Sequence, residues 1–90
     1  IISFTTGIGN INVFKGISIY PNPAKDHLII ENNESLGQFD FEIVNSSGKI
    51  IYNSILLNKS VIDLNLFSSG IYLIRFRKDN SYYFLKFIKE

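Results

Sequence analysis

Cysteine is absent from this 90-residue chain, and histidine occurs once. Without thiols the chain has no disulfides and no thiolate metal sites, and its redox compartment stays open. A metal centre at His27 would need several converging ligands, and only Asp26 and Glu31 stand near it in the sequence. We therefore expect no metal and no other cofactor, and we place His27 at the solvent-exposed start of a strand.

A strong net charge and long apolar runs are also missing. Nine Lys and Arg residues stand against eight Asp and Glu residues, which gives a formal net charge of +1. This balance provides no global field to steer the chain toward nucleic acid or an anionic membrane. Apolar runs such as 82–85 and 55–57 fall far short of the roughly 20 residues that a transmembrane helix needs. We expect no membrane span, and we expect any secretory leader to lie on a longer precursor.

Catalytic machinery is equally hard to find. A chain of this length forms one domain with a modest core, which disfavours a deep catalytic cleft. No serine or lysine has a candidate base beside it in the sequence. Asp40 and Glu42 share one strand face about 6.5 to 7 Å apart, but an acid and base pair also needs contrasting burial, and both look solvated. We expect that the domain is not an enzyme.

The chain is instead rich in short segments typical of β-strands, since 46% of its residues are hydrophobic and 14% are aromatic. Residues 39–43 alternate strictly, with Phe39, Phe41 and Ile43 on one face and Asp40 and Glu42 on the other. Six further strand candidates are ISIY (17–20), HLIIE (27–31), KIIYNSI (49–55), VIDLNLF (61–67), IYLIRFR (71–77) and YYFLKFI (82–88). The pattern predicts an all-β sandwich with antiparallel pairing.

Turn residues set the boundaries of these strands. Residues 1–16 contain three glycines and predict a linker that can contribute one loose strand. Pro21 and Pro23 end the first strand, and Gly48 and the KDNS segment (78–81) each predict a hairpin. Ser60 and Asp63 match a helix capping box, but β-branched neighbours and the lack of a 3.6-residue period argue against a helix there.

Cations and aromatic residues interleave near the C-terminus and raise the alternative of nucleic-acid binding. The cations are Arg75, Arg77, Lys78, Lys86 and Lys89, and the aromatic residues are Phe76, Tyr82, Tyr83, Phe84 and Phe87. Alternation within a β-hairpin explains the same residues, and we favour that explanation.

Four blocks in order carry a resemblance to a known family: SIYPNPAKDHLII (18–30), FEIVNSSGKIIY (41–52), IDLNLFSSGIYLIRF (62–76) and FLKFIK (84–89). The chain resembles the type A C-terminal sorting domain of the type IX secretion system over about residues 17–89. Gly48 and Lys49 match the family's Gly-Lys hairpin, and Gly70 and Tyr72 match its Gly-x-Tyr motif. Phe67 and Ser68 depart from a common Leu-Pro pair, and Phe87 stands where a smaller or branched residue is common.

The resemblance implies an immunoglobulin-like, seven-stranded antiparallel β-sandwich over residues 17–90 that acts as an address and not as an enzyme. The implied partners are the type IX translocon, a surface peptidase that removes the domain, and a cargo domain upstream in the same precursor. The implied route passes through the periplasm to the cell surface or the medium. Cleavage is expected ahead of Ile17, between Thr5 and Gly16.

We hypothesise that Pro21, Asn22, Pro23, Lys86 and Lys89 are recognised by the translocon, because a Pro-x-Pro corner is ordered before binding. Tyr72 resembles a tyrosine corner and is expected to be structural. The last strand, 82–89, is expected at a sheet edge, where it could add to a receptor sheet. Deletion of residues 87–90 is expected to leave a folded core.

Two alternatives stay open. The domain could be an accessory immunoglobulin-like or fibronectin-like module that binds glycan or protein through a row of exposed aromatic residues, for which Tyr52, Tyr82 and Tyr83 are candidates. It could also be a structural spacer at the end of a secreted enzyme.

Overall fold

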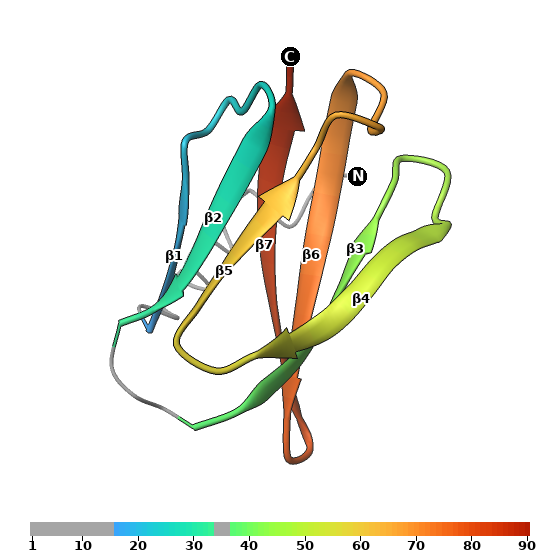
Figure 1. Cartoon of the computed structure of the whole chain (residues 1–90). Coiled ribbons are helices and arrows are strands. Elements are labelled where there is room, and N and C mark those ends of the chain that lie inside the picture. The colour runs from blue at the N-terminus through green and yellow to red at the C-terminus, as the bar shows by residue number, and fades with distance from the viewer. Residues whose placement is uncertain (1–15, 34–36) are drawn as a thin grey trace, which may run out of the picture.

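The computed structural model describes residues 16–33 and 37–90, which form two antiparallel sheets packed face to face (Figure 1). The three-stranded sheet has the order β1-β2-β5, with β1 at Ile17–Tyr20, β2 at His27–Asn32 and β5 at Lys59–Asp63. The four-stranded sheet has the order β4-β3-β6-β7, with β3 at Phe39–Val44, β4 at Ile50–Leu56, β6 at Gly70–Lys78 and β7 at Ser81–Lys89. The predicted seven-stranded, all-β sandwich is confirmed.

The core lies between the two sheets and follows the alternation in the sequence. On β3 and β6, every second residue is buried, and Phe41 lies directly opposite Phe76 with the ring centroids 5.9 Å apart. Burial of such aromatic side chains is the main source of stability in a small sandwich. The buried apolar residues are Ile17, Ala24, Leu28, Ile30, Phe39, Phe41, Ile43, Leu56, Ile62, Leu64, Tyr72, Ile74, Phe76 and Phe87.

The predicted hairpins are confirmed, but the bounds of the predicted strand 61–67 are wrong. β5 begins at Lys59, opposite Glu31, and it ends at Asp63. The Asp63 carboxylate accepts a hydrogen bond from the backbone N–H of Asn65 (2.9 Å), and the N–H of Phe67 then donates to the carbonyl of Leu64 (2.9 Å). This local hydrogen bonding by an aspartate turns the chain although apolar residues continue. The rejection of a helix at 60–63 is confirmed.

The predicted linker lies mostly outside the described residues, which begin at Gly16. Gly16 is buried, and its carbonyl accepts a hydrogen bond from the N–H of Asn33 (2.8 Å). The folded unit therefore includes Gly16.

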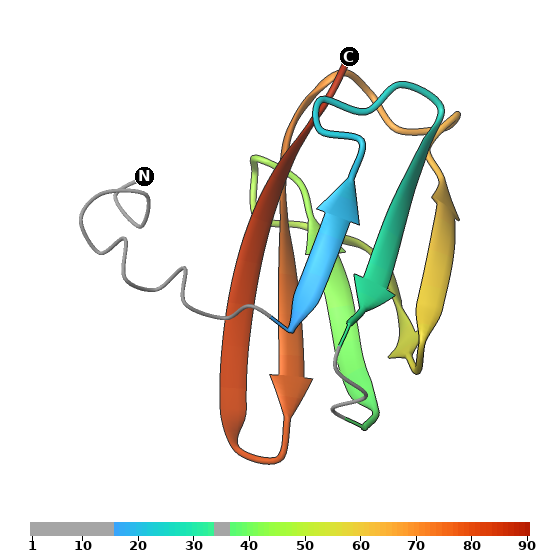
Figure 2. The same ribbon diagram turned by 90° about the vertical axis from the view of Figure 1, so that its left-hand side faces the viewer.

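Each sheet of the sandwich ends in two edge strands. β1 and β5 are the edges of the smaller sheet, and β4 and β7 are the edges of the larger one. The last strand lies at an edge, as predicted, and its C-terminal end lies beside the β1–β2 connection (Figure 2).

Candidate functional site

The corner formed by Pro21, Asn22 and Pro23 connects β1 to β2 and is exposed to solvent. The peptide bonds that precede both prolines are cis. Ala24 follows at once and is completely buried. The corner is therefore an exposed loop whose far end is anchored in the core.

This corner is hydrogen-bonded to the end of β7. The backbone N–H of Ala24 donates to the carbonyl of Ile88, and the N–H of Glu90 donates to the carbonyl of Ala24, both at 2.8 Å. The Asn22 side chain adds two more bonds, because its Nδ2 donates to the carbonyl of Lys86 (3.2 Å) and its Oδ1 accepts from the N–H of Ile88 (3.0 Å). We call these contacts, between residues 22–24 and 86–90, the corner–strand junction.

The junction joins two motifs that lie more than sixty residues apart in the sequence. Asn22 is 64 residues from Lys86 and 66 residues from Ile88. An asparagine can satisfy a main-chain donor and a main-chain acceptor together, so it acts as a short substitute for a paired strand. The proline corner and the basic last strand thus form one continuous surface.

The two lysines of the last strand do not share a face of the sheet. Lys86 lies opposite Leu73, and its side chain is on the outer face of the sheet together with those of Phe84 and Ile88. Lys89 is on the same face of β7 as the buried Phe87, and its ammonium lies close enough to the corner to lower the pKa of Asp26. The two lysines, both expected to be recognised by the translocon, are therefore presented on different faces, since side chains an odd number of residues apart on a strand point to opposite faces.

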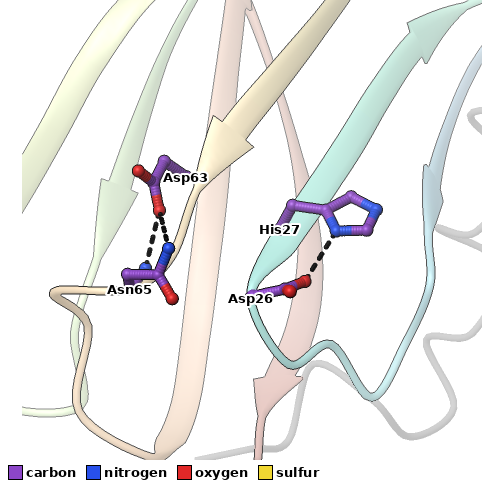
Figure 3. A network of polar contacts seen from close by, with 4 residues as sticks. All are labelled: Asp26, His27, Asp63 and Asn65. Carbon is purple, nitrogen blue, oxygen red and sulfur yellow. Dashed lines mark hydrogen bonds and ion pairs between the residues drawn. The ribbon is translucent and has the colours of Figure 1, made fainter.

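Asp26 and His27 complete the corner (Figure 3). His27 is the exposed first residue of β2, as expected, and its Nδ1 donates to the carboxylate of Asp26 (2.8 Å). This hydrogen bond is the main reason why the pKa of Asp26 lies below its usual value, and the charge of Lys89 acts in the same direction. The carboxylate of Asp63, also drawn in Figure 3, is bonded to Asn65 instead.

Gly48 and Lys49 lie in the β3–β4 turn. Gly48 has a φ of 88°, which a residue with a Cβ adopts only under strain. The side chain of Asn45 accepts hydrogen bonds from the N–H groups of Ser47 and Lys49, both at 3.0 Å. Gly48 and Lys49 are therefore part of a turn that hydrogen bonds to Asn45 hold in place.

Gly70 and Tyr72 begin β6. The hydroxyl of Tyr72 donates to the carbonyl of Ser68, which fastens the preceding loop to the strand. The Tyr72 ring stacks on Phe87 with 5.3 Å between centroids, and Phe67 lies at the same distance on another side. Phe87, a departure from the family pattern, thus fills the core beneath β6.

The buried position of Phe87 contradicts one expectation. Its side chain is fully buried, so deletion of residues 87–90 would remove a core residue and three of the four hydrogen bonds of the corner–strand junction, leaving only the bond to the carbonyl of Lys86. This burial argues against the expectation that such a deletion leaves the core folded, because loss of a buried phenylalanine side chain costs about 3–5 kcal/mol.

Two of the five C-terminal cations are paired with carboxylates within the domain. Arg77 pairs with Asp40 (2.7 Å) and Arg75 pairs with Glu42, both across β3 and β6. Phe76 and Phe87 are buried in the core. Cross-strand pairing and core packing therefore explain these two arginines and these two aromatic residues. Asp40 and Glu42 are the ion-pair partners of the two arginines.

The three tyrosines suggested for a binding module do not form one row. Tyr82 lies on the outer face of β7 beneath the Arg75 guanidinium, which is 5.3 Å from its ring centroid, while Tyr83 points inward against Phe39. Tyr52 lies on β4, the opposite edge of the same sheet, against Phe41. A flat aromatic platform for a glycan is therefore absent at these positions.

Within residues 16–33 and 37–90, no group of three or more His, Asp or Glu side chains is placed to hold a metal ion. The same residues contain no helix with the length and hydropathy needed to cross a bilayer.

The sequence pointed to Asn22 and Lys86 but gave no sign that they touch. Ala24 lies in the first block of the family resemblance, but neither it nor Ile88 was expected to join the corner to the last strand, because a small buried residue and an exposed aliphatic residue carry no chemical pattern. An apolar alanine directly after the exposed Pro-x-Pro corner was the available clue that the chain returns to the core at this point.

Comparisons with known proteins agree with this architecture. Residues 18–90 match the family described as the secretion system C-terminal sorting domain. Among solved structures, a DUF3244-family protein from Bacteroides vulgatus with an immunoglobulin-like β-sandwich fold is similar, with a TM-score of 0.69 and 15% sequence identity over 83% of this chain and 85% of that one. At this identity the likeness shows the fold alone. No curated protein matches the chain.

Proposed function

Because the chain belongs to the family of secretion system C-terminal sorting domains, whose members direct export to the cell surface or beyond by type IX secretion, we propose that the type IX translocon reads this domain in its folded form. The domain would follow a cargo in the same precursor, pass through the periplasm with it, and be removed by a surface peptidase. On this proposal the domain is a substrate of the machinery and performs no catalysis.

The corner–strand junction is the observation that carries the proposal. A signal recognised as a folded surface must keep its shape before binding, because ordering a flexible segment on contact costs binding free energy. The corner is exposed, and four hydrogen bonds tie it to the last strand. Pro21, Asn22, Pro23 and Lys86 would then be read together, with Lys89 at the side of the corner near Asp26.

Cleavage by the surface peptidase is proposed between Thr5 and Gly16. Proteases need an extended, accessible chain, and Gly16 is already held by its hydrogen bond from Asn33. N-terminal sequencing of the released domain tests this placement, and a first residue inside any of the seven strands would overturn it.

The decisive experiment fuses residues 1–90 behind a fluorescent protein exported to the periplasm. The fusion is expressed in a host with the type IX machinery and in a translocon-deficient control. Fluorescence at the surface or in the medium of the first host alone would support the proposal. Retention in the periplasm of both hosts would refute it and would favour a binding module or a spacer.

Variants of the fusion then test the junction itself. Asn22→Ala removes both side-chain bonds to β7, whereas Asn53→Ala changes an exposed asparagine of β4 that makes no such contact. Export is expected to fall for the first variant and to stay normal for the second. Equal export of both would show that the junction is not what the translocon reads.

A further inference from the structure

The free edge of β7 is partly closed by the corner. β7 pairs with β6 on one side, in an unbroken register from Ser81 to Lys89. On the other side, the junction occupies the carbonyl of Lys86, both backbone groups of Ile88 and the N–H of Glu90. These bonds show that the even-numbered residues of β7 direct their backbone groups away from β6, because such groups alternate along an antiparallel strand.

A short stretch of this edge remains open. By the same alternation, the N–H and C=O groups of Tyr82 and Phe84 and the N–H of Lys86 point outward. In the described part of the chain, these backbone groups have no hydrogen-bond partner. The result is a row of donors and acceptors that ends where the corner begins.

The other three edges are less suited to accept a strand. β1 has four residues and stops at Pro21, and β5 has five with charged residues at both ends. The pairing of β4 with β3 contains an irregularity at Ile43 and Val44. β7 has nine residues without proline or register shift, and its segment 81–85 carries no charge. An edge of this kind is a template for pairing, which proteins normally block with charge, proline or bulges.

Side chains beside the open stretch define the partner. On the outer face, Tyr82 and Phe84 are 52% and 47% exposed, so both rings are available to a partner. Lys86 follows on the same face, and within the described residues its ammonium has no ion-pair partner. Arg75 and Arg77, its cationic neighbours on the outer face of β6, are already paired with Glu42 and Asp40, so Lys86 is the cation on this face that is available to attract a carboxylate in the described part of the sheet.

We propose that the open edge of β7 at residues 82–86 accepts one extended strand of the receiving secretion machinery, which places an apolar residue against Phe84 and an acidic residue against Lys86. This inference rests on the proposed function and names the contact by which the signal is held. The corner fixes the register, since an added strand cannot extend past Lys86 without displacing Asn22. Main-chain bonds supply affinity, and the two side-chain contacts supply specificity.

Proline substitution tests the edge without breaking the sheet. Phe84→Pro deletes an N–H that points away from β6, and proline is tolerated at such edge positions. Phe84→Ala is the matched control, because it loses the same side chain and keeps the N–H. Tyr82→Pro and Tyr82→Ala form a second pair if Phe84→Pro unfolds, which its melting temperature will show.

The readout is export of the fluorescent fusion, together with a photo-crosslinking amino acid placed at residue 84 or, as a control, at the exposed Val61 of β5. Loss of one main-chain bond is expected to weaken docking of the proline variant about five-fold relative to its alanine control. Lys86→Glu is expected to lower export further, and Lys86→Arg to preserve it. Crosslinks to a machinery protein are expected from residue 84 and not from residue 61.

Three results would overturn the inference. The first is equal export of folded Phe84→Pro and Phe84→Ala while the wild-type fusion is exported. This result would refute docking at the edge of β7 and leave the proposed sorting function intact. The second is a crosslink from residue 84 to a second copy of the chain, together with a dimer that Phe84→Pro converts to a monomer. The third is failure of the wild-type fusion to be exported at all, which removes the proposed function with it.

Discussion

Asn22→Ala gives a direct measure of how firmly the corner holds the last strand. The substitution deletes the bond to the carbonyl of Lys86 (3.2 Å) and the bond from the N–H of Ile88 (3.0 Å). A net hydrogen bond contributes about 0.5–1.5 kcal/mol, and both bonds are exposed, so the free energy of unfolding should fall by about 1–2 kcal/mol. For a domain of this size each kcal/mol lowers the melting temperature by about 4–8 °C.

Amide hydrogen exchange locates the effect. In the wild type the N–H of Ile88 is protected by Asn22, so the variant should exchange this amide roughly ten-fold faster, while amides of the central strands β3 and β6 change only by the global loss of stability. Asn53→Ala serves as the matched control and should leave both measurements unchanged. Unaltered protection of Ile88 in the Asn22 variant would show that the side-chain bonds do not hold β7, and the reasoning about the junction would fail.

Two further predictions concern the same end of the molecule. Phe87→Ala empties a fully buried site beside Tyr72 and should lower the free energy of unfolding, measured by urea denaturation, by about 3–5 kcal/mol. Ile88→Ala changes the neighbouring residue, which is 41% exposed, and should lower it by about 1 kcal/mol or less. Similar losses for both variants would contradict the assignment of Phe87 to the core. NMR titration should place the pKa of Asp26 below its usual value, and His27→Ala should raise that pKa more than Lys89→Ala does. Because this pKa is lower in the folded state, ionised Asp26 stabilises the fold at a pH above its pKa in the unfolded chain, and this stabilisation is lost as the pH falls through its pKa in the folded state. A pKa of Asp26 that neither substitution changes would refute the interactions of Asp26 with His27 and Lys89.

Much of the fold follows from local patterns in the sequence. Strict alternation at 39–43 and 71–77 put the right side chains into the core, because a strand that covers a core must bury every second residue. Gly48 marked a turn that needs positive φ. These features depend on neighbours a few residues apart, which is why they could be predicted. β5 was misplaced for the opposite reason, since Asp63 ends the strand while apolar residues continue through Phe67.

The tertiary structure alone decided how the motif residues are combined. Whether Asn22 reaches Lys86 depends on the packing of β1 and β2 against β7, and no local pattern encodes a contact 64 residues away. The separation of Lys86 from Lys89 depends on which face of β7 turns inward, and the burial of Phe87 settles that choice for the whole strand. Local sequence patterns were thus enough to predict the turns, the family and every strand except the bounds of β5. The surface available to a partner depends on long-range pairing, because hydrogen bonds between distant strands form only when the two sheets close on a common core.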